Sequence, residues 1–307
     1  MAGKVYLLGA GLGTFDTLTM RGWQVLQQAE VLIYDALATG ELLSAVSDDC
    51  LKLPVGKRGG RKSTPQSEIN RLLIAYCHQG KTVVRLKGGD PLIFGRARQE
   101  VEALKAANCA FELIPGLSSV LAAPLLAGIP LTDKCLSSEF VVLTGHKAEQ
   151  FNWEALAKID TLVILMGGRK LRTIIRELHR WGKPSSLPVA IIRNAGRSDQ
   201  RVWCGTLTDI LKQVEGESLS PCAIIIGEVV SLQSKFQSSQ AQPLLGKTIL
   251  VTRAAQQSSR FSQLLEAEGA RVLEMPALEI KPPSSWQALD DAIAELPTFS
   301  WLLLTSA

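Results

Sequence analysis

The sequence predicts an α/β protein of two lobes, each built on a mainly parallel or mixed sheet with flanking helices, followed by a partial α/β segment. Short apolar runs alternate with amphipathic stretches from the N-terminus onward, and this alternation restarts twice along the 307 residues. Continuous apolar strands interleaved with helices are typical of parallel sheets covered on both faces. The length also exceeds the roughly 100–200 residues of one domain.

The first lobe is predicted from residues 1–127. Its expected strands are Val5–Leu8, Val31–Tyr34, Thr82–Leu86 and Phe111–Ile114. Its expected helices are Thr19–Gln28, Gln66–His78 and Ala97–Ala107. Residues 117–131, interrupted by Pro124, Gly128 and Pro130, are expected to form a helix that leads into the crossover between the lobes.

The second lobe is predicted from residues 128–232. Its expected strands are Phe140–Thr144, Leu162–Met166, Val189–Ile192, Val202–Gly205 and Cys222–Ile226, with helices near Lys170–Trp181 and Thr208–Val214. Only a polar loop separates the strands near Val189 and Val202, which indicates a hairpin and hence a mixed sheet.

Residues 233–245 are predicted to be a linker, because the stretch SLQSKFQSSQAQ is rich in Ser and Gln and poor in large apolar groups. Residues 246–307 restart an α/β pattern. The expected strands are Thr248–Thr252, Arg271–Glu274 and Trp301–Leu304, and the expected helices are Ser258–Glu268 and Trp286–Leu296. This segment is expected to be an incomplete domain with a marginal core.

Composition excludes several classes of protein. Hydrophobic residues make up 46% and charged residues 20% of the chain, with a net charge of +4, which is too mild for an obligate nucleic-acid binder. No apolar run approaches the roughly 20 residues of a membrane span, and no signal-peptide pattern opens the chain, so a cytoplasmic protein is expected. The six cysteines lack metal-ligand spacing and are interpreted as reduced thiols, so no metal is expected.

Two glycine-rich segments follow predicted strands. The first, Gly9 to Gly13, is a weak signal, because a dinucleotide fingerprint needs Gly or Ala where Thr14 stands. Asp35 nevertheless ends the second strand 24 residues after Gly11, near where a ribose-binding aspartate would lie. A nicotinamide-dependent oxidoreductase therefore stays open on these residues alone.

The second segment, RLKGGDPLIFG over residues 85–95, is more specific. A strand runs into Gly88, Gly89, Asp90 and Pro91, which predicts a sharp turn with a carboxylate and bare backbone at the carboxyl end of the strand. Such an edge suits a small polar ligand.

An ordered set of motifs resembles the uroporphyrinogen-III C-methyltransferases. The motifs are VYLLGAGLG, LIYDALA, VGKRGG, STPQ, VVRLKGGDPLIFGR, PGLSS, GIPLT, VVLTGH, LMGG and IIIGEVVSL, and they span about residues 4–232. The resemblance implies a two-lobed tetrapyrrole methylase fold, which is usually homodimeric. It also implies that S-adenosyl-L-methionine binds between the lobes and methylates uroporphyrinogen III to precorrin-2 by way of precorrin-1.

The resemblance also implies roles for individual residues. The expected cofactor contacts are Leu12, Gly88, Gly89, Asp90, Ile93, Ser118, Ser119, Met166 and Ala195. Asp35 corresponds to the proton acceptor of the family and Lys57 to its proton donor. Because the substrate carries many carboxylates, cations near the cleft are expected to bind it, namely Arg58, Arg61, Lys62, Lys87 and Arg96.

Several positions depart from the family pattern. Leu12 and Thr14 stand where a proline and an aspartate are usual, Asp133 and Lys134 replace a His-Arg pair, and Arg193 replaces a glutamate. A methyltransferase acting on a later corrinoid intermediate is therefore an alternative. The segment after Gly246 resembles the opening of a uroporphyrinogen-III synthase, and no synthase activity is expected from it.

Overall fold

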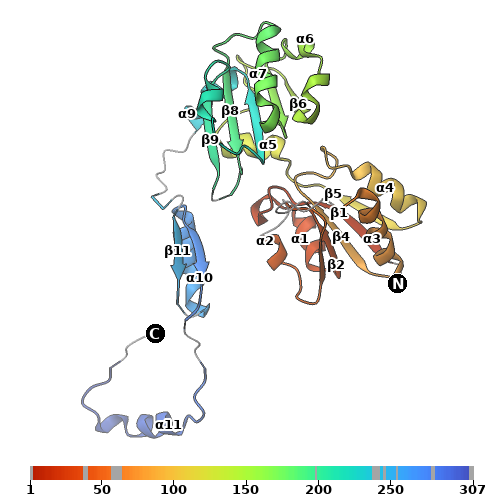
Figure 1. The fold of residues 1–307 in the computed structure, drawn as a ribbon. Coiled ribbons are helices and arrows are strands. Elements are labelled where there is room, and N and C mark those ends of the chain that lie inside the picture. Colours follow the sequence, from red (N-terminus) through yellow and green to blue (C-terminus); the bar gives the residue numbers. More distant parts are fainter. Residues whose placement is uncertain are drawn as a thin grey trace. The chain divides into compact units, whose positions relative to one another are not determined.

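The computed structural model describes residues 3–36, 41–56, 64–197, 199–236, 243–244, 247–253, 255–277 and 281–303. The chain divides into two compact units, Met1–Ser238 and Ser239–Ala307. The larger unit contains two five-stranded sheets, and the smaller one a two-stranded sheet (Figure 1).

The first sheet is wholly parallel, as the continuous apolar runs predict. Its strands are β1 (Lys4–Gly9), β2 (Val31–Tyr34), β3 (Leu51–Pro54), β4 (Thr82–Lys87) and β5 (Ala110–Ile114), in the order β3-β2-β4-β1-β5. All five carboxyl ends therefore lie at one edge, which is where ligands bind in such sheets. Strand β3 and the short helix α2 (Glu41–Ser44) are absent from the sequence prediction.

Helices cover both faces of the first sheet (Figure 1). On one face, α1 (Met20–Gln27) and α2 pack against side chains such as Leu8, Leu32 and Leu86. On the other, α3 (Gln66–His78) and α4 (Ala97–Ala106) pack against the alternate set, which includes Val5 and Val83. This division follows from the two-residue period of a strand.

The second sheet is mixed. Its strands are β6 (Phe140–Thr144), β7 (Thr161–Leu165), β8 (Pro188–Arg193), β9 (Arg201–Thr206) and β10 (Cys222–Ile226), in the order β6-β7-β10-β8-β9. Strands β8 and β9 pair antiparallel, which confirms the predicted hairpin.

Two layers enclose the second sheet. Helices α6 (Trp153–Leu156), α7 (Leu171–Arg180) and α8 (Ile210–Gln213) cover one face. Helix α5 (Ser119–Leu126) covers the other, where Val120 and Ala123 share a buried cluster with strand residues such as Val163. Short helical turns complete this unit: η1 (Phe15–Thr17), η2 (Gly145–Gln150), η3 (Gly168–Lys170), η4 (Glu228–Leu232) and α9 (Gln233–Phe236).

The smaller unit has little buried surface. Strand β11 (Thr248–Val251) pairs in parallel with β12 (Arg271–Glu274), joined by α10 (Ala255–Ala267). Helix α11 (Gln287–Ala294) and the turn η5 (Leu296–Thr298) follow, with exposed side chains. The strand predicted at 301–304 is not formed in its described part: Trp301 to Leu303 are irregular and exposed, without the neighbouring strand that a sheet requires.

Among the described residues, no helix is both long and apolar enough to cross a membrane.

Candidate cofactor and substrate site

Three glycines bring the backbone together at the carboxyl edge of the first sheet. Gly9 ends β1, Gly89 follows β4 and Gly116 follows β5. A Cβ on Gly9 would lie 2.5 Å from the amide nitrogen of Gly116 and 2.6 Å from the carbonyl oxygen of Gly89. Any side chain at Gly9 would therefore force the three segments apart.

The two glycine segments of the sequence analysis are hydrogen-bonded to each other. The amide of Gly89 donates to the carbonyl of Gly11 at 2.8 Å, and the amide of Gly11 donates to the carbonyl of Gly89 at 3.3 Å. Gly89 has a φ of +68°, which favours glycine, and a Cβ there would meet nothing closer than the Ser118 Cα at 3.8 Å. The turn thus lies within van der Waals distance of the Ser118 and Ser119 backbone, so these two segments adjoin at this edge.

The carboxylate of Asp90 is oriented by backbone amides. Its Oδ1 accepts from the amide of Leu92 at 2.8 Å, and its Oδ2 accepts from the amide of Gly116 at 3.4 Å. A carboxylate has about four lone-pair sites, so both oxygens keep acceptor capacity for a ligand. Ile93, next along the turn, is 40% exposed and supplies an apolar surface.

Ser118 and Ser119 stand where the chain passes from the first sheet to the second. The hydroxyl of Ser118 accepts from the amide of Val120 at 3.3 Å and caps α5, whose body packs on the second sheet. Both serines follow β5 at the same edge as Gly89. The expected cofactor residues of the first sheet are therefore brought together.

Met166 and Ala195 lie at one edge of the second sheet. Each follows a strand, β7 or β8, and both of these strands run antiparallel to β10, so their carboxyl ends point the same way. Met166 is 41% exposed and has a φ of +56°, and Asn194 beside Ala195 has a φ of +51°. A positive φ strains the backbone of a non-glycine residue, and such strained residues cluster at functional sites.

Leu12 connects the first glycine loop with this second edge. A Cβ on Gly196 would come within 2.8 Å of the Leu12 Cδ1, so the leucine side chain lies against the segment that follows Ala195. The amide of Leu12 also donates to the Thr17 hydroxyl at 3.0 Å. A proline at position 12 has no N–H, so the leucine makes a hydrogen bond that the usual family residue cannot make.

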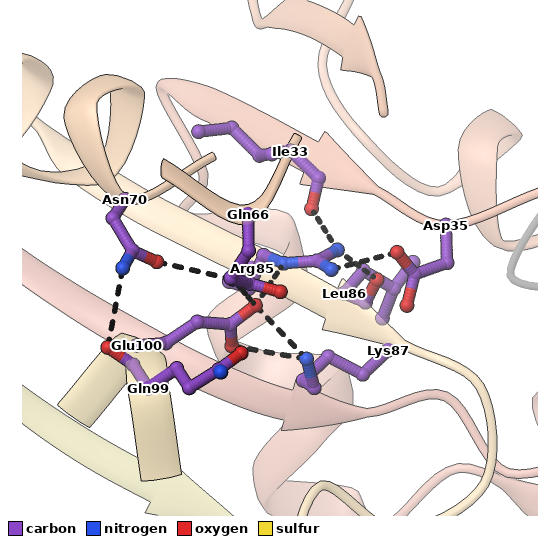
Figure 2. Close-up of polar contacts among 9 residues, drawn as sticks. All are labelled: Ile33, Asp35, Gln66, Asn70, Arg85, Leu86, Lys87, Gln99 and Glu100. Atoms are coloured by element: carbon purple, nitrogen blue, oxygen red, sulfur yellow. Dashed lines mark hydrogen bonds and ion pairs between the residues drawn. The ribbon is translucent and has the colours of Figure 1, made fainter. Parts of the chain in front are cut away.

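Asp35 follows β2 at the same edge as the glycine turn, and its partner is a buried arginine. The Arg85 Nη2 donates to the Asp35 Oδ1 at 2.6 Å, as Figure 2 shows. Behind Arg85, the buried carboxylate of Glu100 accepts from the Arg85 Nε and from the Lys87 Nζ, each at 3.0 Å. Asp35 is thus the outermost member of a buried ionic cluster.

Lys87 does not present the exposed cation that the sequence analysis expected. Lys87 as a whole is 2% exposed, and its ammonium group contacts Glu100 rather than solvent. Burial lowers the pKa of Lys87, and the positive charge of Arg85 lowers it further, while Glu100 acts in the opposite direction. Lys87 lies on the same face of β4 as Arg85, so its side chain points toward α4 and Glu100 instead of into the site.

Of the other expected cations, Arg96 alone lies within the described residues. Lys57, Arg58, Arg61 and Lys62 lie outside the described residues. Strand β3, parallel to β2, ends at Pro54, at the edge that carries Asp35. Arg96 is exposed, directly before α4, with a φ of +55°.

Two departures from the family pattern have local structural roles. Arg193 donates to Glu217 at 3.2 Å and lies over the ring of Trp203. Asp133 accepts from the amides of Cys135 at 2.9 Å and Leu136 at 3.1 Å, which closes a turn. These substitutions stabilise the second lobe by means of their own partners.

The nicotinamide alternative loses its structural basis. A dinucleotide loop opens directly into a helix whose N-terminus meets the pyrophosphate, but here α1 begins only at Met20, after the turn η1. Asp35, moreover, is engaged by Arg85.

Within the described ranges, no group of three or more His, Cys, Asp or Glu side chains is arranged to hold a metal ion.

The buried cluster was missed in the sequence analysis, although a signal for it was present. Arg85 and Lys87 stand two residues apart in the apolar run of β4, so they share one face of a central strand. Cations on such a face must be paired, because isolated buried charges are prohibitively costly. The requirement predicts a carboxylate partner, and the structure shows that it is Glu100, on the helix that follows.

Comparison with known proteins identifies the family of the chain. Residues 4–211 match the family model of tetrapyrrole (corrin/porphyrin) methylases. The chain belongs to this family. Residues 259–307 match the model of uroporphyrinogen-III synthase HemD.

The methylase unit has similar relatives along its whole length. A uroporphyrinogen-III C-methyltransferase of Synechococcus elongatus is 52% identical over 233 residues, which cover 76% of this chain and 96% of the relative. A siroheme synthase of Actinobacillus pleuropneumoniae is 45% identical over 75% of this chain but only 48% of its own length. A crystal structure of the Thermus thermophilus uroporphyrin-III C-methyltransferase, complexed with S-adenyl homocysteine, is 33% identical with a TM-score of 0.65, and covers 75% of this chain and all of that one.

Proposed function

We propose that the chain transfers methyl groups from S-adenosyl-L-methionine to carbon atoms of uroporphyrinogen III, giving precorrin-1 and then precorrin-2. The observation that carries this proposal is the 52% identity to a uroporphyrinogen-III C-methyltransferase over 96% of that relative's length. The solved relative with S-adenyl homocysteine, the demethylated form of the donor, supports the choice of methyl source. Precorrin-2 feeds sirohaem and cobalamin synthesis.

The residues at the two sheet edges fit the donor. The backbone of Gly88 and Gly89 offers amides and carbonyls to polar groups, and Asp90 offers acceptors to an amino or hydroxyl group. Exposed Ile93 and Met166 offer apolar contact to an adenine or a thioether. Leu12, Ser118, Ser119 and Ala195 complete the proposed cofactor set.

The donor, when bound, supplies an activated methyl group on a sulfonium. The ring carbon of the substrate attacks this methyl as the carbon–sulfur bond breaks, and a proton must then leave the macrocycle. Asp35 is proposed to accept a proton and Lys57 to donate one. Alignment of carbon, methyl and sulfur by the two lobes contributes most of the rate.

The carboxylates of the substrate are proposed to bind Arg58, Arg61, Lys62 and Arg96. Arginine suits this role because its planar fork pairs with carboxylates in two parallel hydrogen bonds. Lys87 leaves this proposed set because it is buried against Glu100. We further propose a cytoplasmic protein that forms a homodimer, and light scattering on the purified chain tests the dimer.

The deciding experiment is an anaerobic incubation of the chain with uroporphyrinogen III and S-adenosyl-L-methionine labelled in its methyl group. The expected product carries two labelled methyl groups. Parallel incubations supply later corrinoid intermediates in place of uroporphyrinogen III. If only these become labelled, the chain is a methyltransferase of the same fold with a different substrate. Calorimetry with the methyl donor, its demethylated product and the nicotinamide dinucleotides completes the test, and binding of a dinucleotide alone would reject the methyltransferase.

A further inference from the structure

Four charged side chains form a continuous chain from the interior of the first sheet to its carboxyl edge, as Figure 2 shows. Lys87 contacts both oxygens of Glu100 at 3.0 Å. Glu100 contacts the Arg85 Nε at 3.0 Å, and Arg85 contacts the Asp35 Oδ1 at 2.6 Å. Two cations and two carboxylates therefore alternate along this series of ion pairs.

Only one of these four side chains is substantially exposed to solvent. The side chain of Glu100 is 0% exposed and those of Arg85 and Lys87 are 3% exposed, whereas that of Asp35 is 34% exposed. Asp35 is thus the member that reaches the site. The charged groups recorded around it in the described ranges are Arg85 directly and, beyond it, Lys87 and Glu100; the segment 57–63 lies outside those ranges.

Arg85 is held from every side. Its Nη1 donates to the carbonyls of Leu86 at 3.2 Å and Ile33 at 3.5 Å, its Nε donates to Glu100, and its Nη2 donates to Asp35. A guanidinium is planar, so fixing the Nε and Nη1 atoms also fixes the direction of Nη2. The position of the Asp35 carboxylate therefore depends on the anchor behind Arg85.

Glu100 is itself anchored by the polar face between α3 and α4. Its Oε1 accepts from the Gln66 amide at 3.3 Å, and Gln66 also donates to Asn70 at 3.0 Å. Asn70 in turn donates to the carbonyl of Gln99 at 3.2 Å, which ties α3 to α4. The anchor thus belongs to the rigid layer under the sheet and not to a loop.

We propose that Glu100 is a positioning residue, which acts through Arg85 to fix the orientation of the Asp35 carboxylate. The proposal rests on the proposed function, in which Asp35 moves a proton. The physical reason is the anchor: the Glu100 carboxylate fixes the Arg85 guanidinium through its Nε, and Arg85 fixes Asp35 through its Nη2.

The primary variant is Glu100→Gln, which keeps the shape and removes the charge. The neutral amide cannot hold the Arg85 guanidinium as a carboxylate does, so Arg85 no longer fixes the Asp35 carboxylate in one direction. We expect turnover to fall roughly tenfold while the affinity for S-adenosylhomocysteine stays unchanged. A folded variant with the turnover of the original chain would overturn the proposal.

A matched control lies on the same helix. Glu102 is exposed and pairs only with Arg98 among its recorded partners in the described part of the chain, so Glu102→Gln makes the same charge change away from the cluster. Its turnover is expected to match that of the original chain. The conservative variant Glu100→Asp keeps the negative charge, and it is expected to retain more turnover than Glu100→Gln. A role in packing alone predicts the reverse order, because glutamine and not aspartate keeps the shape of glutamate.

Two further measurements keep the test decisive. If Glu100→Gln does not fold, Arg85→Lys replaces it: the lysine keeps the charge but cannot contact both carboxylates, and wild-type turnover in this variant would reject the positioning role. The chemical shift of the Asp35 carboxyl carbon, measured by NMR with and without Glu100→Gln, reads the cluster without reference to turnover. An unchanged chemical shift counts against the cluster itself, whereas normal turnover of Asp35→Ala removes the proton-accepting role of Asp35 on which the proposal rests.

Discussion

At the scale of single residues, Asp35 shows how the site is assembled from distant parts of the sequence. Its carboxylate follows β2, and the guanidinium that contacts it comes from β4, fifty positions along the chain. The two partners of the ion pair differ in burial: Arg85 is buried and Asp35 is partly exposed. Such a pair can orient a proton acceptor while leaving it open to a substrate.

Asp35→Ala and Lys57→Ala are each expected to slow methyl transfer by about a hundredfold without loss of donor binding, because general acid and base groups typically contribute about 10²–10⁴-fold. Single-turnover rates and calorimetry with S-adenosylhomocysteine measure the two effects separately. Unchanged rates in both variants would remove these residues from the chemistry.

Gly89→Ala and Gly116→Ala are expected to fail in different ways. The Cβ at residue 89 makes no close contact but takes a φ of +68°, so it costs about 1–2 kcal/mol of stability and adds bulk beside the proposed donor. The Cβ at residue 116 would overlap the backbone of Gly9 and Gly89, which costs at least about 1–3 kcal/mol. Urea unfolding and donor calorimetry distinguish a binding defect in the first from a folding defect in the second.

At the scale of elements, strand β4 has two functions at once. Its alternate residues pack into the apolar layer under α1, while Arg85 and Lys87 face α3 and α4 and form the ionic cluster. Its carboxyl end then supplies the glycine turn. A single central strand thus connects the core, the buried charges and the proposed cofactor edge.

Helix α7 is expected to be a main determinant of the stability of the second lobe. Its apolar residues recur with helical spacing, and Leu178 is fully buried in the cluster that α7 shares with β7, β8 and β10. Leu178→Ala is expected to lower the free energy of unfolding by about 2–5 kcal/mol. Arg172→Ala, on the exposed face of the same helix, should change it by less than about 0.5 kcal/mol. Equal effects of the two would contradict the buried placement of Leu178.

At the scale of the whole molecule, the chain combines a methylase unit with a segment that matches the uroporphyrinogen-III synthase family. The methylase unit alone covers 96% of the Synechococcus elongatus relative. The proposed reaction therefore needs residues of the larger unit only.

The two ligands of this unit are expected to respond differently to salt. The tetrapyrrole meets exposed cations such as Arg96, so its dissociation constant should rise roughly tenfold between about 0.05 M and 0.5 M NaCl. The methyl donor meets backbone, hydroxyl and apolar groups, so its affinity should change little. Titrations of each ligand at both salt concentrations test this, and parallel weakening of the two would contradict the assignment of the cations to the substrate.

The order of strands and helices in the larger unit is readable from the sequence, because burial on both faces of a parallel sheet leaves continuous apolar runs. The short β3 and α2 escaped prediction, since four residues carry too little periodicity to stand out. The strand predicted at 301–304 shows the opposite limit: Trp301 to Leu303 have the composition of a strand, but composition cannot supply a hydrogen-bonding neighbour.

The sequence alone determined the α/β class, the hairpin of the second sheet, the glycine turn after β4 and, by its motifs, the methylase family. These follow from local patterns and from the order of motifs. Only the tertiary structure decided that Lys87 faces inward, that Glu100 links it to Arg85, and that Gly9, Gly89 and Gly116 pack together. The physical reason is that pairing of buried charges and close backbone contact join residues far apart in the chain, and no local pattern encodes which partner each will meet.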